Sequence, residues 1–389
     1  MKALLASLMI SLIIGTGLVL YHIQLGIEPS SFRQDVYVGV TFCSNTTQEA
    51  KLLVNRVKNY TNLFVIDSLS MILNETALNE VCDYVVDSDM SFIVWFGAFY
   101  RTELPGPPGV PPLPWHIPWL DSARERWGDR FLGIYLYDEP GGHQLDTGKW
   151  RSGSLPVMSA SDYGDAAGQF TSAISNSIDM RDLKKRGITA FTSDYVLYWF
   201  DCLAGYDCVF AEFCWNHSRI QNVALCRGAA NMQNKQWGAI VTWTYRSPPY
   251  LESGEELFRD MVTAYRAGAK YIIVFNYPKI NPYGILTDEH FHALRDFWNY
   301  INRSQRGKNG VEDGQVALVL PKDYGWGIRN MQDRIWGLWP PDDLSPQIWS
   351  KMNNLIAEHG LRLDIVYDDP QFSLKGKYSK LYAWNGKVN

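Results

Sequence analysis

The sequence lacks the marks of several protein classes. Its longest basic run is 184–186, and 36 basic against 41 acidic residues leave a net charge of −5. A nucleic-acid-binding protein normally carries a positive patch, so the sequence argues against that class. There is no C-x₂-C pair among the six cysteines and no H-E-x-x-H among the seven histidines, which argues against a structural or catalytic zinc site. With 46% hydrophobic, 14% aromatic and 20% charged residues, the composition is that of a globular protein.

The N-terminus carries one long apolar run. Residues 3–20 contain no charge and follow Lys2. Eighteen to twenty helical residues, at about 1.5 Å each, just cross a hydrocarbon core of about 30 Å. The run exceeds the apolar part of a cleaved signal peptide and has no small-residue cleavage site before Glu28. We therefore expect a signal anchor over 1–22 and a stalk over 23–34, with a cleaved signal as the alternative, and a chain that lies outside the cytoplasm after the anchor.

Two further features agree with an extracellular, membrane-anchored glycoprotein. Five N-x-S/T sequons occur, and six cysteines form an even number, as disulfides outside the cytosol require. The closest pair in the sequence, Cys202 and Cys208, is the first candidate for a disulfide. The sequon residues are Asn45, Asn59, Asn74, Asn216 and Asn302.

Eight apolar runs of strand length alternate with helix-like segments. Such continuous apolar runs are typical of strands that are buried on both faces of a parallel sheet. Eight strands with helices between them predict a (β/α)₈ barrel over 35–305. An open doubly wound sheet is less suitable, because no G-x-G-x-x-G follows the first strand. The predicted strands are 36–42, 63–67, 92–96, 131–137, 188–193, 208–213, 239–245 and 271–277.

Beyond the barrel, the chain follows a strand-helix-strand-strand order. This order predicts a small α/β domain of flavodoxin-like character over 306–389. Three tryptophans in its polar loop, Trp326, Trp336 and Trp339, are expected either to pack on the barrel or to line a ligand groove. The proline-rich stretch 104–119 forms either a stiff wall beside the barrel mouth or a surface spacer.

Acidic residues lie at the carboxyl ends of the predicted strands, where barrel enzymes build their active sites. The segment YDEPGGH places two adjacent acids where Pro and Gly-Gly end a strand abruptly. Cleavage of a glycosidic bond requires two carboxyl groups, one as proton donor and one as nucleophile or base. Glu139, Asp138 and Glu212 are therefore the predicted catalytic residues, and Asp67 and Asp194 are the next candidates.

Aromatic residues gather at the same strand ends. Aromatic faces pack on the C–H faces of sugar rings, while polar tips and amides hydrogen-bond the hydroxyl groups. An apolar or anionic neighbourhood also keeps a donor carboxyl protonated near neutral pH. The predicted substrate-binding residues are Asp67, Trp95, Tyr137, Trp215, Trp243, Tyr245 and Asn276.

The segment Asp138-Glu139-Pro140 resembles the strand-four motif of barrel glycoside hydrolases, in which an Asn-Glu-Pro segment carries the acid/base glutamate. The resemblance implies that Glu139 is the acid/base. A barrel followed by a flavodoxin-like domain is also similar to the layout of some bacterial β-galactosidases. Those enzymes take their nucleophile from strand seven, where VTWTYRS has no acid. LGIYLYDE is similar in spacing to the strand-four segment of chitinase-like hydrolases, whose preceding aspartates are Tyr135 and Tyr137 here.

Together these patterns predict a membrane-anchored glycoside hydrolase that binds carbohydrate and uses no cofactor or metal. A non-catalytic carbohydrate-binding or cell-envelope surface protein is the alternative, favoured by the missing strand-seven acid. Metal-assisted hydrolysis through His143, His217 and the acids is a further one. The distance between the Glu139 and Glu212 carboxyl groups predicts the stereochemistry: about 5–5.5 Å indicates retention and about 6.5–9.5 Å inversion.

Overall fold

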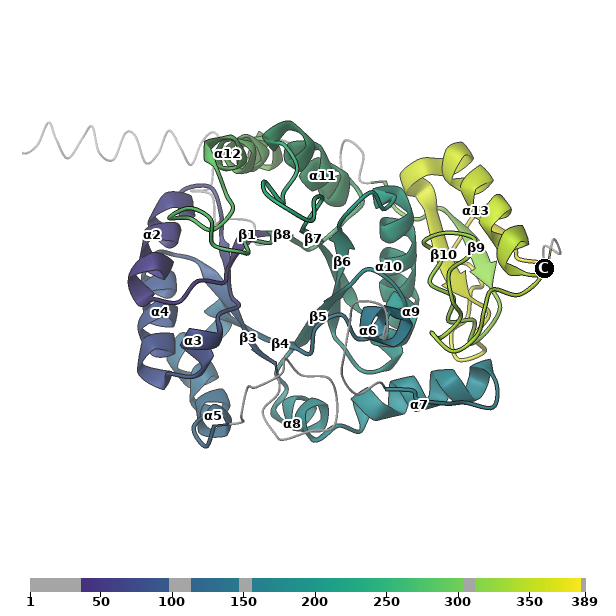
Figure 1. Ribbon diagram of the computed structural model, residues 1–389, viewed down its shortest axis with the longest axis horizontal. Coiled ribbons are helices and arrows are strands. Elements are labelled where there is room, and N and C mark those ends of the chain that lie inside the picture. The colour runs from purple at the N-terminus through teal and green to yellow at the C-terminus, as the bar shows by residue number, and fades with distance from the viewer. Residues whose placement is uncertain (1–35, 98–112, 147–155, 304–311, 386–389) are drawn as a thin grey trace, which may run out of the picture. The chain divides into compact units, whose positions relative to one another are not determined.

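A computed structural model of the protein describes residues 36–97, 113–146, 156–303 and 312–385. Eight parallel strands close into a barrel in sequence order, with β8 paired to β1 (Figure 1). The predicted barrel is confirmed, and each of its eight strands overlaps a predicted one. The strands are β1 Tyr37–Phe42, β2 Leu63–Ile66, β3 Ser91–Gly97, β4 Phe131–Leu136, β5 Ala190–Asp194, β6 Cys208–Phe213, β7 Gln236–Val241 and β8 Tyr271–Val274.

Helices between the strands surround the barrel (Figure 1). Side-chain caps fix where several of them begin; Thr46 and Ser253, for example, form capping boxes with Glu49 and Glu256. The helices are α2 Thr47–Val57, α3 Leu69–Ile72, α4 Glu75–Asp87, α5 His116–Trp127, α6 Pro140–Asp146, α7 Tyr163–Ser175, α8 Ile178–Arg186, α9 Tyr198–Leu203, α10 Arg219–Gln233, α11 Gly254–Arg266 and α12 Asp288–Arg303.

The inside of the barrel is filled by every second side chain of each strand, because successive strand residues face opposite sides. A buried aromatic and aliphatic layer results, in which Phe210 packs on Phe191 and Tyr271 with ring centroids 5.6 Å apart. This layer closes the barrel below its carboxyl end. Polar side chains at the strand ends therefore stand on an apolar floor.

A three-stranded parallel sheet in the order β10-β9-β11 packs beside α10 (Figure 1). A Cβ atom on Gly228 of α10 would lie 2.5 Å from the carbonyl oxygen of Ile365, so glycine permits this close approach. The described residues from 37 onward, the barrel and this sheet included, form one compact unit. The elements are β9 Val316–Leu320, α13 Ser345–His359, β10 Leu363–Tyr367 and β11 Lys380–Ala383.

The predicted fold class needs two corrections. Within the described part of the chain, no helix is long and apolar enough to cross a membrane; the expected anchor 1–22 and stalk 23–34 lie outside that part. The C-terminal sheet has the 2-1-3 order with which a flavodoxin sheet begins, but the described residues add no fourth or fifth strand, so a flavodoxin-like domain is not confirmed. The expected boundary at 305 and most of the stretch 104–119 also lie outside the described residues.

The cysteines differ from expectation, and the burial of two C-terminal tryptophans decides between the two roles that were considered for them. All six cysteines are free thiols, so the expected disulfides, including Cys202–Cys208, are absent. Trp326 and Trp336 are fully buried and donate through Nε1 to backbone carbonyls. Of the two roles considered for them, these tryptophans therefore pack the core.

Candidate active site

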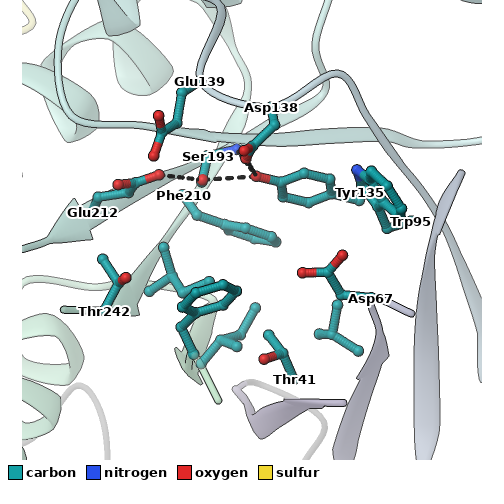
Figure 2. Close-up of a pocket in the computed structure, with 14 residues that line it drawn as sticks. Thr41, Asp67, Trp95, Tyr135, Asp138, Glu139, Ser193, Phe210, Glu212 and Thr242 are labelled. Carbon is teal, nitrogen blue, oxygen red and sulfur yellow. Dashed lines mark hydrogen bonds between the residues drawn. The ribbon is translucent and has the colours of Figure 1, made fainter. Parts of the chain in front are cut away.

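A cavity of about 120 Å³ opens at the carboxyl ends of the barrel strands (Figure 2). Its floor is the apolar barrel layer, and Thr41, Trp95, Thr242 and Phe275 stand around its walls. Four acidic residues face it as well: Asp67, Asp138, Glu139 and Glu212. An apolar basin with a few convergent polar groups is the usual form of a small-molecule site.

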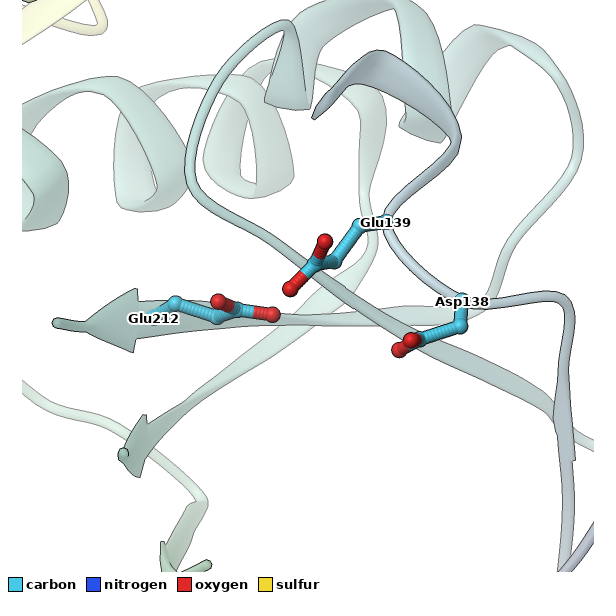
Figure 3. A group of neighbouring side chains, drawn as sticks. All are labelled: Asp138, Glu139 and Glu212. Atoms are coloured by element: carbon cyan, nitrogen blue, oxygen red, sulfur yellow. The ribbon is translucent and has the colours of Figure 1, made fainter. Parts of the chain in front are cut away.

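The three predicted catalytic carboxyl groups lie together (Figure 3). One oxygen from each of Asp138, Glu139 and Glu212 lies within 4.8 Å of one from each of the others. Glu212 is 5% exposed, whereas Asp138 is exposed at the rim. Two ionised carboxylates at such a distance repel by about 3 kcal/mol at an effective dielectric constant of roughly 20. The cluster is therefore more stable when some of its carboxyl groups are protonated.

Glu139 is held at the start of α6 by its backbone. Its φ of 47° is left-handed, a conformation that costs energy for a residue with a Cβ atom. Its N–H donates to the carbonyl of Ser193 over 3.1 Å, and its own carbonyl accepts from the N–H of His143 over 2.8 Å. This turn leaves strand β4 abruptly and keeps the Glu139 carboxyl at the cavity.

Asp194, at the end of β5, fixes the same turn from outside the barrel. Its buried carboxylate accepts hydrogen bonds from the N–H groups of Gly141 (2.6 Å), Gly142 (3.0 Å), Tyr195 (2.8 Å) and Val196 (3.1 Å). Burial and the nearby Glu212 carboxyl raise the pKa of Asp194, and the backbone donors oppose that rise. A carboxylate at the first N–H groups of α6 also suits the positive end of the helix dipole. Asp194 is therefore a positioning residue for α6 and Glu139.

Two hydroxyl groups join Asp138 to Glu212. Ser193 Oγ lies 2.5 Å from Glu212 Oε1 and 2.7 Å from the hydroxyl of Tyr135, which lies 2.7 Å from Asp138 Oδ1 (Figure 2). The Tyr135 oxygen also accepts from the N–H of Ser193 over 3.2 Å. Burial and the neighbouring Asp138 and Glu212 carboxyls raise the pKa of Tyr135, which keeps its proton.

Asp67 lies across the cavity from these groups (Figure 2). Burial, together with the negative charge of Asp138, raises the pKa of Asp67 to about 7. The Cys43 thiol donates to its Oδ2 over 3.6 Å. Near neutral pH, Asp67 can therefore donate as well as accept a hydrogen bond, as recognition of a sugar hydroxyl requires.

Of the predicted substrate-binding residues, the structure brings Asp67 and Trp95 to the cavity. Tyr137 is 2% exposed and donates to Asp179 over 2.9 Å, away from the cavity. Asn276 uses its amide within the loop after β8, where its Nδ2 donates to the carbonyl of Tyr283 and its Oδ1 accepts from the N–H of Ile285, each over 2.8 Å. The structure therefore does not bring these two side chains to the cavity, because each hydrogen-bonds within the scaffold.

The remaining predicted aromatics lie beyond the strand ends and outside the cavity lining. Strand β7 ends at Val241, earlier than expected. Thr242, the next residue, faces the cavity, whereas the aromatic residues that follow it do not line the cavity. Trp243 stacks on Tyr277 with centroids 6.1 Å apart and donates to its carbonyl. Trp215 packs edge-on against Trp243, and Tyr245 is 45% exposed.

The histidines considered for metal chemistry do not join the carboxyl cluster. In the described ranges, the group with mutual distances suited to a metal ion is Asp138, Glu139 and Glu212. Burial and the charges of two arginines lower the pKa of His217 to about 4, and its Nδ1 lies 3.5 Å from Cys214 Sγ.

Ser193 is the site residue that was missed entirely, and Tyr135 was considered only as a neighbour of the acids. The alternation of inward and outward side chains along β5 is the signal that could have identified Ser193. Phe191 points into the barrel, so Ser193, two residues later, does as well. Asp194, the last residue of β5, points outward.

Comparison with known proteins identifies the fold. No protein-family model and no curated protein matches the sequence. GH5_18 from Streptomyces cattleya, solved with GlcNAc, has a TM-score of 0.52 and 12% identity over 90% of this chain and 99% of that chain. A variant solved with Manβ1-4GlcNAc has a TM-score of 0.53 with the same identity and coverage. α-L-Fucosidase isoenzyme 2 from Paenibacillus thiaminolyticus gives 0.50 and 12%, over 89% of this chain and 59% of that chain.

These similar structures are glycoside hydrolases, and the likeness establishes the fold. The chain is a TIM barrel. Its chemistry has to be argued from its own side chains, because one barrel fold supports many reactions.

Proposed function

We propose that the protein is a retaining glycoside hydrolase. Glu139 protonates the leaving-group oxygen while Glu212 attacks the anomeric carbon; water then cleaves the glycosyl ester while Glu139 removes a proton from that water. The observation that carries the proposal is the approach of the two carboxyl groups to within 4.8 Å. An inverting enzyme needs about 6.5–9.5 Å to admit a water molecule between acid and base. Asp138 and Tyr135 lie beside the pair and influence its charge.

Carbohydrate is the ligand class that the cavity suits best. Trp95 offers an aromatic face, and Asp67 and Thr242 offer hydrogen-bonding groups at the cavity wall. The GH5_18 structures contain Manβ1-4GlcNAc and GlcNAc, which makes the β-mannosyl and N-acetylglucosaminyl linkages the first to try.

The test compares variants on a panel of nitrophenyl glycosides and on Manβ1-4GlcNAc. Glu139→Gln should lower kcat by about 1,000-fold on the disaccharide, because the leaving group then departs without a proton. The exposed Glu125→Gln is the matched control and should hydrolyse as the unmodified protein does. Proton NMR of the first product should show retained anomeric configuration. Equal turnover by Glu139→Gln and the unmodified protein, or an inverted product, would overturn the proposal.

A carbohydrate-binding protein without activity is the second candidate. Thr242 supports this candidate. This residue, which follows β7, presents a hydroxyl group to the cavity, whereas the barrel glycoside hydrolases that the strand-four motif resembles carry their nucleophile on strand seven. Calorimetric binding of the disaccharide without any sugar release would favour this candidate, and turnover would exclude it.

We also propose that the protein lies outside the cytoplasm and carries glycans. All five sequon asparagines are exposed, which supports access for glycosylation. A mobility shift of the native protein after amidase removal of N-glycans tests this, and unchanged mobility contradicts it.

A further inference from the structure

Four oxygens, one each from Asp138, Tyr135, Ser193 and Glu212, form a chain of three contacts. Only two hydroxyl hydrogens, those of Tyr135 and Ser193, are available for the three contacts. The contacts are Asp138–Tyr135, Tyr135–Ser193 and Ser193–Glu212, at 2.7, 2.7 and 2.5 Å. If both carboxyls were ionised, Tyr135 would donate to Asp138 and Ser193 to Glu212. The Tyr135 and Ser193 oxygens would then face each other at 2.7 Å with no hydrogen between them, which is repulsive.

A third hydrogen removes this conflict, and it can come from either carboxyl group. We propose that Asp138 and Glu212 share one proton through a relay formed by the hydroxyl groups of Tyr135 and Ser193. With the proton on Asp138, the chain runs from Asp138 to Tyr135 to Ser193 to Glu212, and Glu212 is ionised. With the proton on Glu212, every hydrogen bond points the other way, and Asp138 is ionised.

The backbone restricts the relay to these two directions. The N–H of Ser193 donates to the Tyr135 oxygen over 3.2 Å and occupies one of its two lone pairs. The other lone pair accepts from Asp138 or from the Ser193 hydroxyl, but not from both. Passing between the two directions moves three protons by one oxygen each. Each O–H bond that breaks is replaced by one that forms, so a single charge passes between Glu212 and Asp138.

Charged neighbours favour a singly protonated pair. The Asp138 and Glu212 carboxyls lie within 4.8 Å of each other, so ionisation of both would place two negative charges together even while Glu139 is protonated. Protonation of both Asp138 and Glu212 is also less favourable, because four hydrogens would then be present for only three hydrogen bonds. The titratable groups that interact electrostatically with Asp138 are Asp67, His143 and Tyr135, and those that interact with Glu212 are Asp194, Tyr198, Cys214 and Tyr135; Glu139 lies beside both carboxyls.

The relay has a catalytic consequence, which rests on the proposed function. When Asp138 holds the shared proton, Ser193 donates to an ionised Glu212, which is the state a nucleophile needs. Asp138 and Tyr135 thereby set the charge of a carboxyl group on the other side of the cavity. They are positioning residues for the nucleophile, and neither needs to touch the substrate.

Infrared difference spectra test the shared proton without a substrate. The C=O band of a protonated carboxyl is separate from carboxylate bands and shifts in D₂O. Near pH 7, Tyr135→Phe should lose one protonated carboxyl and gain one carboxylate, because Ser193 can then donate to Glu212 while Asp138 ionises in solvent. Both proteins carry Asp67→Asn, because Asp67 titrates near pH 7 and responds to the charge of Asp138; other protonated carboxyls then cancel in the difference. Tyr84→Phe, which loses only a surface hydrogen bond to Asn55, is the control and should give no carboxyl difference.

Asp138→Asn is the second variant and keeps the test decisive if Tyr135→Phe fails to fold. Its amide donates to Tyr135 permanently, so the protonated band should disappear with no gain of carboxylate. A protonated band of unchanged intensity in either folded variant would overturn the relay.

Activity gives an independent readout. Asp138→Asn should exceed Asp138→Ala in kcat by at least tenfold, because only the amide supplies the third hydrogen; equal rates would contradict the catalytic role. If the unmodified protein hydrolysed no glycoside, the proposed function would fail while the infrared result still decided the relay.

Discussion

Acidic side chains at the barrel mouth and at the junction with the C-terminal sheet have opposite electrostatic surroundings. At the barrel mouth, Asp138, Glu139 and Glu212 lie within 4.8 Å of one another, next to hydroxyl groups. At the junction with the C-terminal sheet, Asp364 faces Arg227, with Nε 2.7 Å from Oδ1 and side chains 0% and 2% exposed.

The difference separates a reactive region from a structural one. The Arg227 guanidinium also donates to the carbonyls of Glu312, Leu361 and Leu363, so the charges and hydrogen bonds at the junction are satisfied. Removal of one partner there leaves a buried charge uncompensated. At the mouth, like charges are held together against their repulsion, which shifts proton affinities and is typical of sites that use protons. Neutralising one acid should therefore destabilise the junction and stabilise the mouth.

Glu212→Gln should give the largest effect and separate activity from stability. Loss of the nucleophile should lower kcat by about 10,000-fold on the disaccharide. The free energy of unfolding should rise, by on the order of 1 kcal/mol, because one member of the repelling cluster becomes neutral and its amide can donate to Ser193. Urea unfolding and steady-state kinetics measure the two quantities. A variant that loses stability along with activity would contradict the description of the mouth as an electrostatically strained cluster.

Arg227→Met should show the opposite sign at the junction. Asp364 would remain buried without its cation, so the free energy of unfolding should fall by about 3–5 kcal/mol. Activity per folded molecule should not change. Adding Asp364→Leu should recover at least half of the loss, because an apolar pair of similar volume replaces the ions. Arg126→Met, at an exposed pair with Asp83, is the control and should cost less than about 1 kcal/mol.

Asp194→Asn should reduce activity without abolishing it. The amide nitrogen would face the N–H donors of Gly141 and Gly142, so the start of α6 and Glu139 would shift. Misplacement of a catalytic group by about 1 Å can cost about 100-fold, and we expect a loss of that order in kcat with little change in KM. Kinetics on the same disaccharide measure it, with the exposed Asp121→Asn as control. An unchanged kcat would show that Glu139 is held by other contacts.

The barrel was predictable because each of its strands leaves a local trace. The runs at Cys208–Phe213 and Tyr271–Val274 are continuous and apolar, as strands with helices outside and a packed core inside must be. The same rule of alternation places Glu212 inside. Glu139 and Asp138 were predictable because Pro140 marks where β4 leaves the sheet.

The rest of the site depends on geometry that the sequence does not state locally. Ser193 was missed because a serine beside an aspartate is not by itself a catalytic motif. Its role becomes apparent only when the inward-facing positions of β5 are known. Trp243 and Tyr245 were misplaced because aromatic residues extend the apolar pattern past the end of β7 at Val241. Tyr137 was misassigned because its partner, Asp179, lies on α8, 42 residues away in the chain.

Asp67 sharpens the comparison through pH rather than through a loss of activity. Its pKa rises from about 3.8 to about 7 on folding, so between these values the folded protein holds a proton that the unfolded chain releases. Its contribution to the free energy of unfolding therefore decreases as pH rises from about 4 to about 7. Asp67→Asn stays neutral throughout and should lose less stability over this range than the unmodified protein in urea unfolding. Equal slopes would mean that neither burial nor the charge of Asp138 raises the pKa of Asp67, which would contradict this prediction.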